Sequence, residues 1–333
     1  MADKPMVAVL GAGAWGTALS VLLARNGYPL WLWGNDRVLL QRLAQERVNA
    51  TALPGIVLPR QIEMHADLAD VARTASNFLI AVPSHAFRAT LAVLRANIKP
   101  GTTVAWATKG LEPNSGSLLS DVARDVLGNQ AALAVVSGPT FAGEIAHGLP
   151  AALTVAAADR ATAERVAAWL RNERVRVYTS DDVAGVQLGG AIKNVMAIAA
   201  GISDGLGFGA NARAALITRG LAELTRLGVA MGGKRETFMG LAGAGDLILT
   251  CTDNTSRNRR VGLGLGQGRG LREVLAEIGQ EAEGVATARE LYRLAQARNI
   301  DMPITEQVYR VLYDNLPPQT AVEALLRRDP RPE

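Results

Sequence analysis

The chain of 333 residues contains only one cysteine, three histidines and 5% aromatic residues. A single cysteine excludes an internal disulfide framework and is typical of a reducing compartment. The histidines and the cysteine do not have the spacing of a metal site, so we expect no metal. Lysine and arginine form no long block, although the net charge is +4, and we therefore expect no nucleic-acid partner.

Charged residues are also absent from residues 5–24, which raises the question of a signal peptide or a membrane anchor. Gly11, Gly13 and Gly16 interrupt this run, and the pattern changes there from strand-like to helix-like. We therefore expect a cytoplasmic protein without stable membrane insertion. The hydrophobic content of 49% is ordinary for a globular protein, and the length allows two domains.

Short apolar blocks alternate with helical patterns through the first half of the chain. We expect strands at 6–10, 30–33, 78–82, 103–107, 132–137 and 152–156, and helices at 14–26, 37–45, 117–127 and 161–170. Residues 49–59, which contain two prolines, are expected to form a loop. Since no hairpin signal separates the strands, the pattern predicts a parallel, doubly wound α/β sheet of the Rossmann type.

Strand candidates disappear after about Asp182, and helical patterns follow. These patterns cover residues 183–200, 212–227, 234–238, 271–278, 287–298 and 305–313. The sequence therefore predicts an α/β domain at residues 1–182 and an all-α domain at residues 183–333.

Residues 11–16, Gly-Ala-Gly-Ala-Trp-Gly, fit the pattern G-x-G-x-x-G between an expected strand and an expected helix. The first glycine would form the tight turn, the second would admit a pyrophosphate, and the third would pack helix against sheet. Free N–H groups at the start of the helix would bind the phosphates. The first domain is therefore expected to bind a dinucleotide through Gly11, Gly13 and Gly16.

A second cofactor signal, Asn35-Asp36-Arg37, follows about twenty residues further on. An acidic residue at this place binds the ribose hydroxyls of NAD, whereas a nearby arginine holds the 2′-phosphate of NADP. Asp36 is explained equally well as a helix N-cap. The residues alone leave the choice between NAD and NADP open.

Lys193 is the one charged residue in the otherwise small and apolar run 185–201. A buried lysine is costly unless its ammonium reaches water or takes part in chemistry, and snorkelling to water is the alternative reading. Desolvation lowers the pKa of a lysine toward neutrality, which suits a general base. Gly189, Gly190 and Ala197 lie one helical turn away and would let another element approach closely.

Other polar groups follow the expected strands or lie in the helical domain. Lys109 would bind an anionic substrate at the sheet edge, or it is a plain surface cation. Asp246 would orient a catalytic lysine or bind a substrate hydroxyl, or it is a helix N-cap. Ser256, Arg257 and Asn258 combine a charged fork with neighbouring donors and suit a phosphate, or they form a solvated basic loop.

The histidines and the cysteine are the alternative candidates to Lys193 for acid–base catalysis. His85 follows Pro83-Ser84 at the end of a strand and remains a minor candidate. His65 and His147 are expected in loops. Cys251 has no recognisable histidine partner and is expected to be a small packed residue.

Taken together, these residues resemble the bacterial NAD(P)-dependent glycerol-3-phosphate dehydrogenase family over residues 11–309. The matching segments are GAGAWGTALS, VPSH, WATKGLE, SGPTFAGE, GVQLGGAIKNVMAIAAGISDG, FGANARAALITRGLAE, GLAGAGDLILTCTDNTSRNRR and MPITEQVY. The resemblance implies interconversion of sn-glycerol 3-phosphate and dihydroxyacetone phosphate with NAD(P)H, NADPH being slightly favoured, and a supply of glycerol 3-phosphate for phospholipid synthesis.

The resemblance also implies roles for single residues. Lys193 would accept the proton in alcohol oxidation and donate it in ketone reduction. The implied substrate contacts are Lys109, Gly138, Thr140, Lys193, Asp246, Ser256, Arg257 and Asn258. The nucleotide contacts that the resemblance implies are Ala14, Trp15, Lys109, Ala142, Arg257 and Glu283. We add the glycines of the loop, Asn35, Asp36 and Glu281 as further candidate contacts. The sequence departs from the family at Asn35, where a basic residue is common, and at Glu281, where an apolar residue is common.

Two other readings remain. A β-hydroxyacid dehydrogenase would have the same domains and a catalytic lysine but would act on a carboxylate, and a nucleotide-sensing module would bind NAD(P)H without turnover. The apolar helical domain could supply the interface of a homodimer, but no such interface can be located in the sequence.

Overall fold

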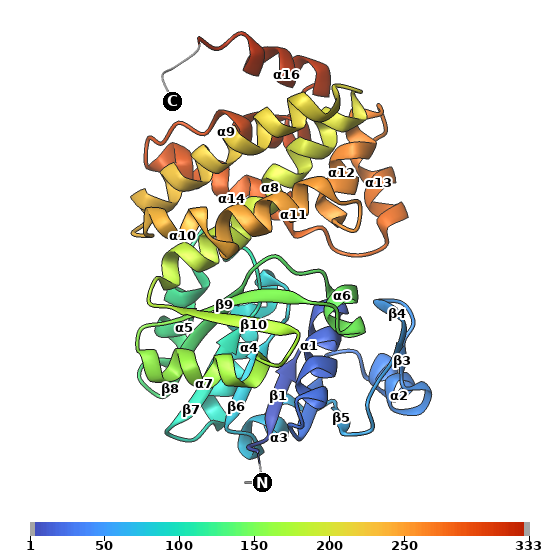
Figure 1. Cartoon of the computed structure of the whole chain (residues 1–333), viewed down its shortest axis with the longest axis vertical. Coiled ribbons are helices and arrows are strands. Elements are labelled where there is room, and N and C mark those ends of the chain that lie inside the picture. The colour runs from blue at the N-terminus through green and yellow to red at the C-terminus, as the bar shows by residue number, and fades with distance from the viewer. Residues whose placement is uncertain (1–3, 330–333) are drawn as a thin grey trace. The chain divides into compact units, whose positions relative to one another are not determined.

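The computed structural model describes residues 4–329 and divides into two compact units (Figure 1). The first unit comprises residues 1–112 and 118–187, and the second comprises residues 113–117 and 188–333. Residues 1–3 and 330–333, which the two expected domain ranges include, lie outside the described residues.

The first unit is built on an eight-stranded sheet with the order β10-β9-β8-β7-β6-β1-β2-β5. Its strands are β1 (Val7–Leu10), β2 (Leu30–Trp33), β5 (Ile62–His65), β6 (Asn77–Ile80), β7 (Thr102–Trp106), β8 (Ala131–Ser137), β9 (Ala151–Ala157) and β10 (Val175–Ser180). The order reverses at β1, with β2 on one side and β6 on the other. In a doubly wound sheet this reversal is where ligands bind.

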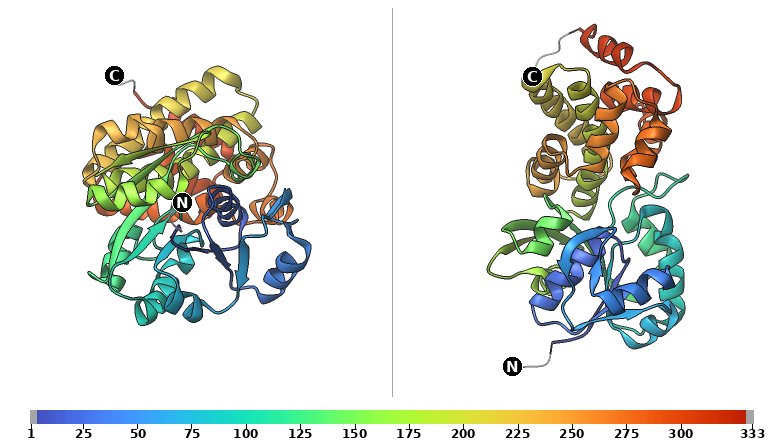
Figure 2. Two further views of the ribbon diagram at one scale, coloured as in Figure 1. Left: turned by 60° about the horizontal axis from the view of Figure 1, so that its bottom comes forward. Right: turned by 90° about the vertical axis from the view of Figure 1, so that its right-hand side faces the viewer.

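Helices cover both faces of this sheet (Figures 1 and 2). They are α1 (Ala14–Arg25), α2 (Arg37–Glu46), α3 (Leu68–Thr74), α4 (Ser84–Asn97), α5 (Leu119–Leu127), α6 (Ala142–His147) and α7 (Arg160–Leu170). Helix α1 contacts α6 and α7, whereas α4 contacts α3 and α5. Strands β1 and β6 are buried along their whole length, as expected of strands covered on both faces.

The expectation of a wholly parallel sheet is wrong at one place, because β9 pairs with β8 in the antiparallel direction. A parallel partner would need a crossover that covers the face of the sheet. The connecting segment instead forms the six-residue helix α6, which contacts α1, and the chain returns beside β8. All other strand pairs of the sheet are parallel.

Further local expectations are also corrected. Residues 49–59 are not a plain loop, because β3 (Val48–Asn49) and β4 (Leu53–Val57) form an antiparallel pair there. The sequence reading missed β5 and β10, as well as α3, α4 and α6. In β10 valine alternates with Arg176 and Tyr178, and this period-two pattern in the sequence indicates a strand whose valines are buried, as the structure has them.

Within the described residues, the regular elements of the second unit are all helices, as the sequence predicted. Its helices are the end of α8 (Val183–Gly205), α9 (Gly209–Ala230), α10 (Arg235–Met239), the π-helix η1 (Leu241–Gly245), α11 (Asp246–Thr252), α12 (Arg257–Gly266), α13 (Leu271–Ile278), α14 (Glu283–Ala297), α15 (Pro303–Tyr313) and α16 (Pro318–Leu326). The predicted architecture, a Rossmann-type domain followed by an all-α domain, is confirmed.

Helix α8 is the centre of the second unit. Every residue from 185 to 203 is buried, as expected of a helix that is apolar on all sides. Among the described helices it alone is long and apolar enough to span a membrane, with a mean hydropathy of 1.3, but 89% of that stretch is buried in the protein. It is therefore a helix of the core.

Candidate active site

The loop between β1 and α1 has the geometry that a dinucleotide needs. A Cβ at Gly16 would overlap the backbone of Gly11, whose carbonyl carbon would lie 3.0 Å away, so the third glycine permits close packing of helix and loop. A Cβ at Gly13 would meet no atom within 4 Å. Since glycine at position 13 is not required by the protein's own packing, the free space there fits a group that comes from outside.

The start of α1 supplies donors to that space. Gly13 is the N-cap, it makes no side-chain cap, and the first turn contains no acidic residue. The first backbone bond of the helix runs from Thr17 N–H to the Gly13 carbonyl, so the N–H groups of Ala14, Trp15 and Gly16 have no acceptor within the helix. Free N–H groups without a competing carboxylate suit a pyrophosphate.

The second cofactor signal lies on the surface. Asn35 and Asp36 are both exposed. Asp36 is the N-cap of α2, and its Oδ1 accepts a hydrogen bond of 3.0 Å from the N–H of Leu39. The N-cap reading of Asp36 therefore holds, and its second carboxylate oxygen has no part in this cap.

Lys109, Gly138 and Thr140 lie together in the first unit. The Lys109 ammonium donates to the carbonyl oxygen of Gly138 at 3.3 Å, and the Thr140 hydroxyl donates to the same oxygen at 3.3 Å. Gly138 has a φ of 137° and follows β8 directly. Lys109 is half-buried, and Ala142 begins α6 a few residues further on. The structure therefore brings together three of the substrate contacts that the resemblance implies.

Lys193 lies in the middle of α8 and is paired with Asp246, the first residue of α11. The residues are 5% and 0% exposed, and the Lys193 ammonium donates to Asp246 Oδ1 in a short ion pair. The snorkelling alternative for Lys193 is therefore wrong. Asp246 is not a helix N-cap either, because Gly245 is the N-cap of α11 and the Asp246 carboxylate accepts a hydrogen bond from the Lys193 ammonium.

The distance between α8 and the segment carrying Asp246 is set by backbone contact. A Cβ at Gly189 would lie 2.9 Å from the carbonyl carbon of Ala242 and 3.3 Å from Cα of Gly243. Only glycine allows this approach, as the small residues around Lys193 predicted. Asp246 follows η1, and π-turns of this kind occur often at functional sites.

Ser256, Arg257 and Asn258 form the start of α12 and not a solvated loop. Ser256 is the N-cap, with its Oγ accepting a 3.2 Å hydrogen bond from the N–H of Arg259. Ser256 and Asn258 are 5% and 8% exposed, whereas Arg257 is half-buried. No acidic residue lies in the first turn, so a half-buried guanidinium and free backbone N–H groups meet at one helix end.

The segment before α14 contacts this helix end. The Arg257 guanidinium donates to Oε1 of Gln280 at 3.4 Å, and Asn258 Oδ1 accepts a 2.9 Å hydrogen bond from the N–H of Gly284. Glu281 is exposed, and Glu283 is half-buried as the first residue of α14. Sequence reasoning missed Gln280, which carries no motif and is recognisable only from its contact.

The competing residues are placed elsewhere. Cys251 is fully buried, as expected of a small packed residue, and this burial raises the pKa of its thiol to about 12. His147 ends α6 and contacts the Gly143 carbonyl through Nδ1, and His65 ends β5 with its ring against Trp31, so the loop expectation is wrong for both. His85 lies in the first turn of α4.

The second unit also contains a cavity of about 820 Å³, lined mainly by α9, α15, α16 and the end of α8. None of the predicted site residues lines it. The candidate site is therefore defined by the side chains above and not by this cavity.

A Rossmann-type domain with an open glycine loop, joined to a helical domain that contains a buried lysine, defines the class of nicotinamide-dependent dehydrogenases. The comparisons with known proteins give the particular family. The family described as NAD-dependent glycerol-3-phosphate dehydrogenase matches with its N-terminal part at residues 6–163 and with its C-terminal part at residues 182–323. The chain belongs to this family, as the sequence predicted, and is an oxidoreductase.

Individual relatives agree with this assignment. A protein of Methylococcus capsulatus named glycerol-3-phosphate dehydrogenase [NAD(P)+] is 57% identical over 328 residues, which are 98% of each chain. A protein of the same name from Aeromonas hydrophila is 52% identical over the whole of both chains. The crystal structure of glycerol-3-phosphate dehydrogenase from Coxiella burnetii superposes with a TM-score of 0.95 at 45% identity, covering 98% of this chain and 100% of that chain.

Proposed function

We propose that this protein interconverts sn-glycerol 3-phosphate and dihydroxyacetone phosphate with NAD(P)H, and that Lys193 is the general acid and base. The observation that carries the proposal is the buried pair of Lys193 and Asp246 in the same unit as the anion-binding start of α12. The names of the relatives and the family membership support the choice of substrate.

The first unit would hold the cofactor. The space at Gly13 and the free N–H groups of Ala14, Trp15 and Gly16 fit a pyrophosphate. When bound, the nicotinamide supplies or takes the hydride at C2 of the substrate. We assign further nucleotide contacts to Gly11, Asn35, Asp36, Lys109, Ala142, Arg257, Glu281 and Glu283, on the basis of the sequence motifs and the family resemblance.

Lys193 would manage the proton. In ketone reduction its ammonium gives a proton to the C2 oxygen, and in alcohol oxidation its amine takes that proton from the C2 hydroxyl. The Asp246 carboxylate holds the ammonium in place. Asp246 also contacts Thr250, whose hydroxyl donates to the backbone carbonyl oxygen of Asp246 at 2.6 Å. Asp246 is therefore assigned the orientation of Lys193.

The start of α12 would bind the phosphate. The Arg257 guanidinium supplies a planar pair of donors, and the backbone N–H groups of the first turn supply more. Because Asn258 Oδ1 is occupied by the N–H of Gly284, its Nδ2 group is the side-chain donor that remains for the ligand. We assign further substrate contacts to Lys109, Gly138, Thr140 and Ser256.

The first experiment measures oxidation of NADPH and of NADH by the purified protein with dihydroxyacetone phosphate. Turnover with this substrate, together with a higher kcat/KM for NADPH, is the expected result. Turnover of hydroxy acids without turnover of the triose phosphate would show a β-hydroxyacid dehydrogenase. Nucleotide binding without any turnover would show a sensing module, and either result would overturn the proposal.

The role of Lys193 is tested by Lys193→Met. General acid–base catalysis contributes about 10²–10⁴-fold, so kcat should fall by at least about 10²-fold. This variant leaves Asp246 buried without a counter-charge, which costs about 3–5 kcal/mol. The double variant Lys193→Met, Asp246→Leu removes both charges and serves as the folding control. Near-normal kcat in either folded variant would exclude the assigned role.

We further propose that the product supplies phospholipid synthesis in the cytoplasm and that the chain forms a homodimer. The single cysteine supports a reducing compartment. Leu326 of the second unit is 78% exposed and is a candidate contact of such a dimer. Sedimentation equilibrium tests the dimer, and a monomer at micromolar concentration would contradict it.

A further inference from the structure

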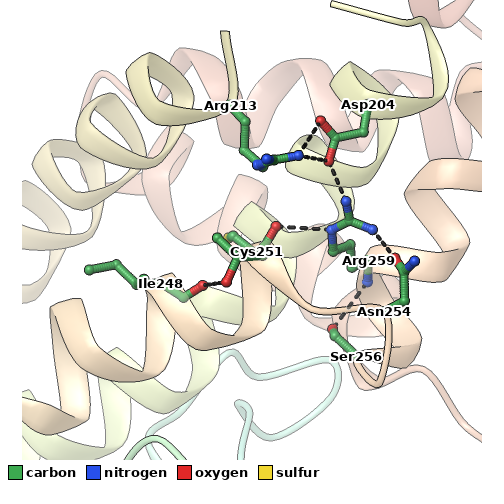
Figure 3. A network of polar contacts seen from close by, with 8 residues as sticks. Asp204, Arg213, Ile248, Cys251, Asn254, Ser256 and Arg259 are labelled. Atoms are coloured by element: carbon green, nitrogen blue, oxygen red, sulfur yellow. Dashed lines mark hydrogen bonds and ion pairs between the residues drawn. The ribbon is translucent and has the colours of Figure 1, made fainter. Parts of the chain in front are cut away.

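Arg259 is a buried cation that the proposed mechanism does not use. It lies in the first turn of α12, two residues after Arg257, and is 6% exposed. Figure 3 shows its guanidinium at the centre of a network that joins Asp204, Cys251 and Asn254. A charge so far removed from water is costly unless its hydrogen-bonding groups are satisfied.

Each arm of this guanidinium has its own acceptor. Nε donates to the carbonyl oxygen of Cys251 at 3.0 Å, Nη1 donates to Asn254 Oδ1, and Nη2 donates to Asp204 Oδ2. These acceptors belong to three different segments, which are the end of α11, the α11–α12 connection and the end of α8. A planar fork with several fixed donors can join them, whereas the single ammonium of a lysine cannot.

The three segments carry the residues of the proposed reaction. Helix α8 carries Lys193, α11 begins with Asp246, and the connection leads directly to the Ser256 cap of α12. Residues 252–255 of this connection are exposed, so the guanidinium is an anchor beneath a segment that otherwise faces water.

We propose that Arg259 is a positioning residue, which fixes the phosphate-binding start of α12 relative to the Lys193–Asp246 pair. The inference rests on the proposed function, because it assigns the phosphate to this helix end. Arg259 itself acts through Asn254 and Cys251 and does not contact the substrate. Its loss should therefore change binding of the phosphate group more than the proton transfer.

The chain contains a matched control in Arg213. Its guanidinium donates to both carboxylate oxygens of Asp204, at 3.0 and 2.9 Å, and it lies on α9. Arg213 thus shares Asp204 with Arg259 but does not contact the α11–α12 connection. Arg213→Gln removes an ion pair of the same network without removing the anchor.

The experiment compares Arg259→Met, Arg259→Lys and Arg213→Gln by steady-state kinetics, with inorganic phosphate as the inhibitor and NADPH binding as a separate measurement. Arg259→Met removes three hydrogen bonds to a charged group and should raise KM for dihydroxyacetone phosphate and Ki for phosphate by about tenfold or more. Arg259→Lys should give a smaller rise. In both variants kcat should change less than KM, and the Kd for NADPH should stay within about twofold.

Arg213→Gln should leave KM and Ki within about twofold of the unmodified protein. If Arg259→Met does not fold, Asn254→Ala decides the question, because Asn254 is exposed and its loss removes one contact of the anchor. An unchanged KM in folded Arg259→Met, or in Asn254→Ala and Arg259→Lys together, would overturn the proposal. An equal rise of KM in Arg213→Gln would also overturn it, whereas failure of the proposed function would appear as absent turnover in the unmodified protein.

Discussion

A single methyl group added between α8 and α12 should increase the distance between Lys193, the proposed general acid and base, and the proposed phosphate site. A Cβ at Gly262 would lie 2.8 Å from both the carbonyl carbon of Ile198 and the nitrogen of Ile202 and would overlap the Ile198 carbonyl oxygen. Carbon contacts in proteins are ordinarily about 3.5–4.0 Å. Since all three atoms belong to helical backbone, the two helices must move apart by roughly 1 Å.

Gly262→Ala is therefore expected to affect both stability and catalysis. Forcing a methyl group into a packed interior costs about 1–3 kcal/mol, and a misplacement of about 1 Å can lower the rate about 10²-fold. We expect kcat/KM for dihydroxyacetone phosphate to fall by about that factor at a temperature where the variant is folded.

The measurement is NADPH oxidation together with the melting temperature, and the control is Gly270→Ala. A Cβ at Gly270 would meet no atom within 4 Å, and its φ of −74° is ordinary for alanine. The control should therefore keep kcat/KM and Tm near their original values. If Gly262→Ala kept both values as well, backbone contact between α8 and α12 would not set the geometry of the proposed site.

Three further predictions follow from the described contacts. Gly13→Ala should weaken NADPH binding at least tenfold, as measured by titration, and should leave Tm unchanged. The added Cβ meets no protein atom but fills the proposed pyrophosphate space. Unchanged binding would show that the loop is not part of the cofactor site. Burial raises the pKa of Glu223 from 4.5 to about 7, so the folded protein binds this proton more tightly than the unfolded chain does. The free energy of unfolding therefore falls by about 3 kcal/mol as the pH rises from 4.5 to about 7. Glu223→Gln should flatten the dependence of Tm on pH between 5 and 8, and an equally steep curve would contradict the assignment. Asn35→Arg should raise the kcat/KM ratio of NADPH over NADH, and an unchanged ratio would exclude this position from the 2′-phosphate contact.

The sequence allowed us to predict those site residues that are unusual among their neighbours in the sequence. Lys193 stands out because it is the one charge in an apolar helix, and the glycines of residues 11–16 stand out because they lie between a strand and a helix. The direction of β9 could not be predicted, because the alternation of residues identifies a strand but not the neighbour with which it pairs.

Contacts between residues that are distant in the sequence could not be predicted from local patterns either. Asp246 lies 53 residues from Lys193, and its neighbours in the sequence were also consistent with an N-cap or a ligand of a substrate hydroxyl. Arg259 and Arg260 are adjacent and chemically identical, yet the first is buried in a network and the second is exposed. Nothing in the local pattern distinguishes them, because the difference is produced by the packing of α12 on α8.

The close packing of small residues is what connects the chemistry of the second unit to its fold. Gly284 repeats the arrangement of Gly262, because a Cβ there would lie 2.7 Å from the Asn194 carbonyl oxygen and 2.7 Å from Asn258 Oδ1. Asn194 adjoins Lys193, and Asn258 belongs to the proposed phosphate site. The close approach at Gly284 therefore places α14 against Asn194 and Asn258. The Gly284 N–H also orients the Asn258 amide, so that Nδ2 remains for a ligand. Helices held apart by large side chains could keep a core of equal volume, but they could not keep these polar groups within hydrogen-bonding distance.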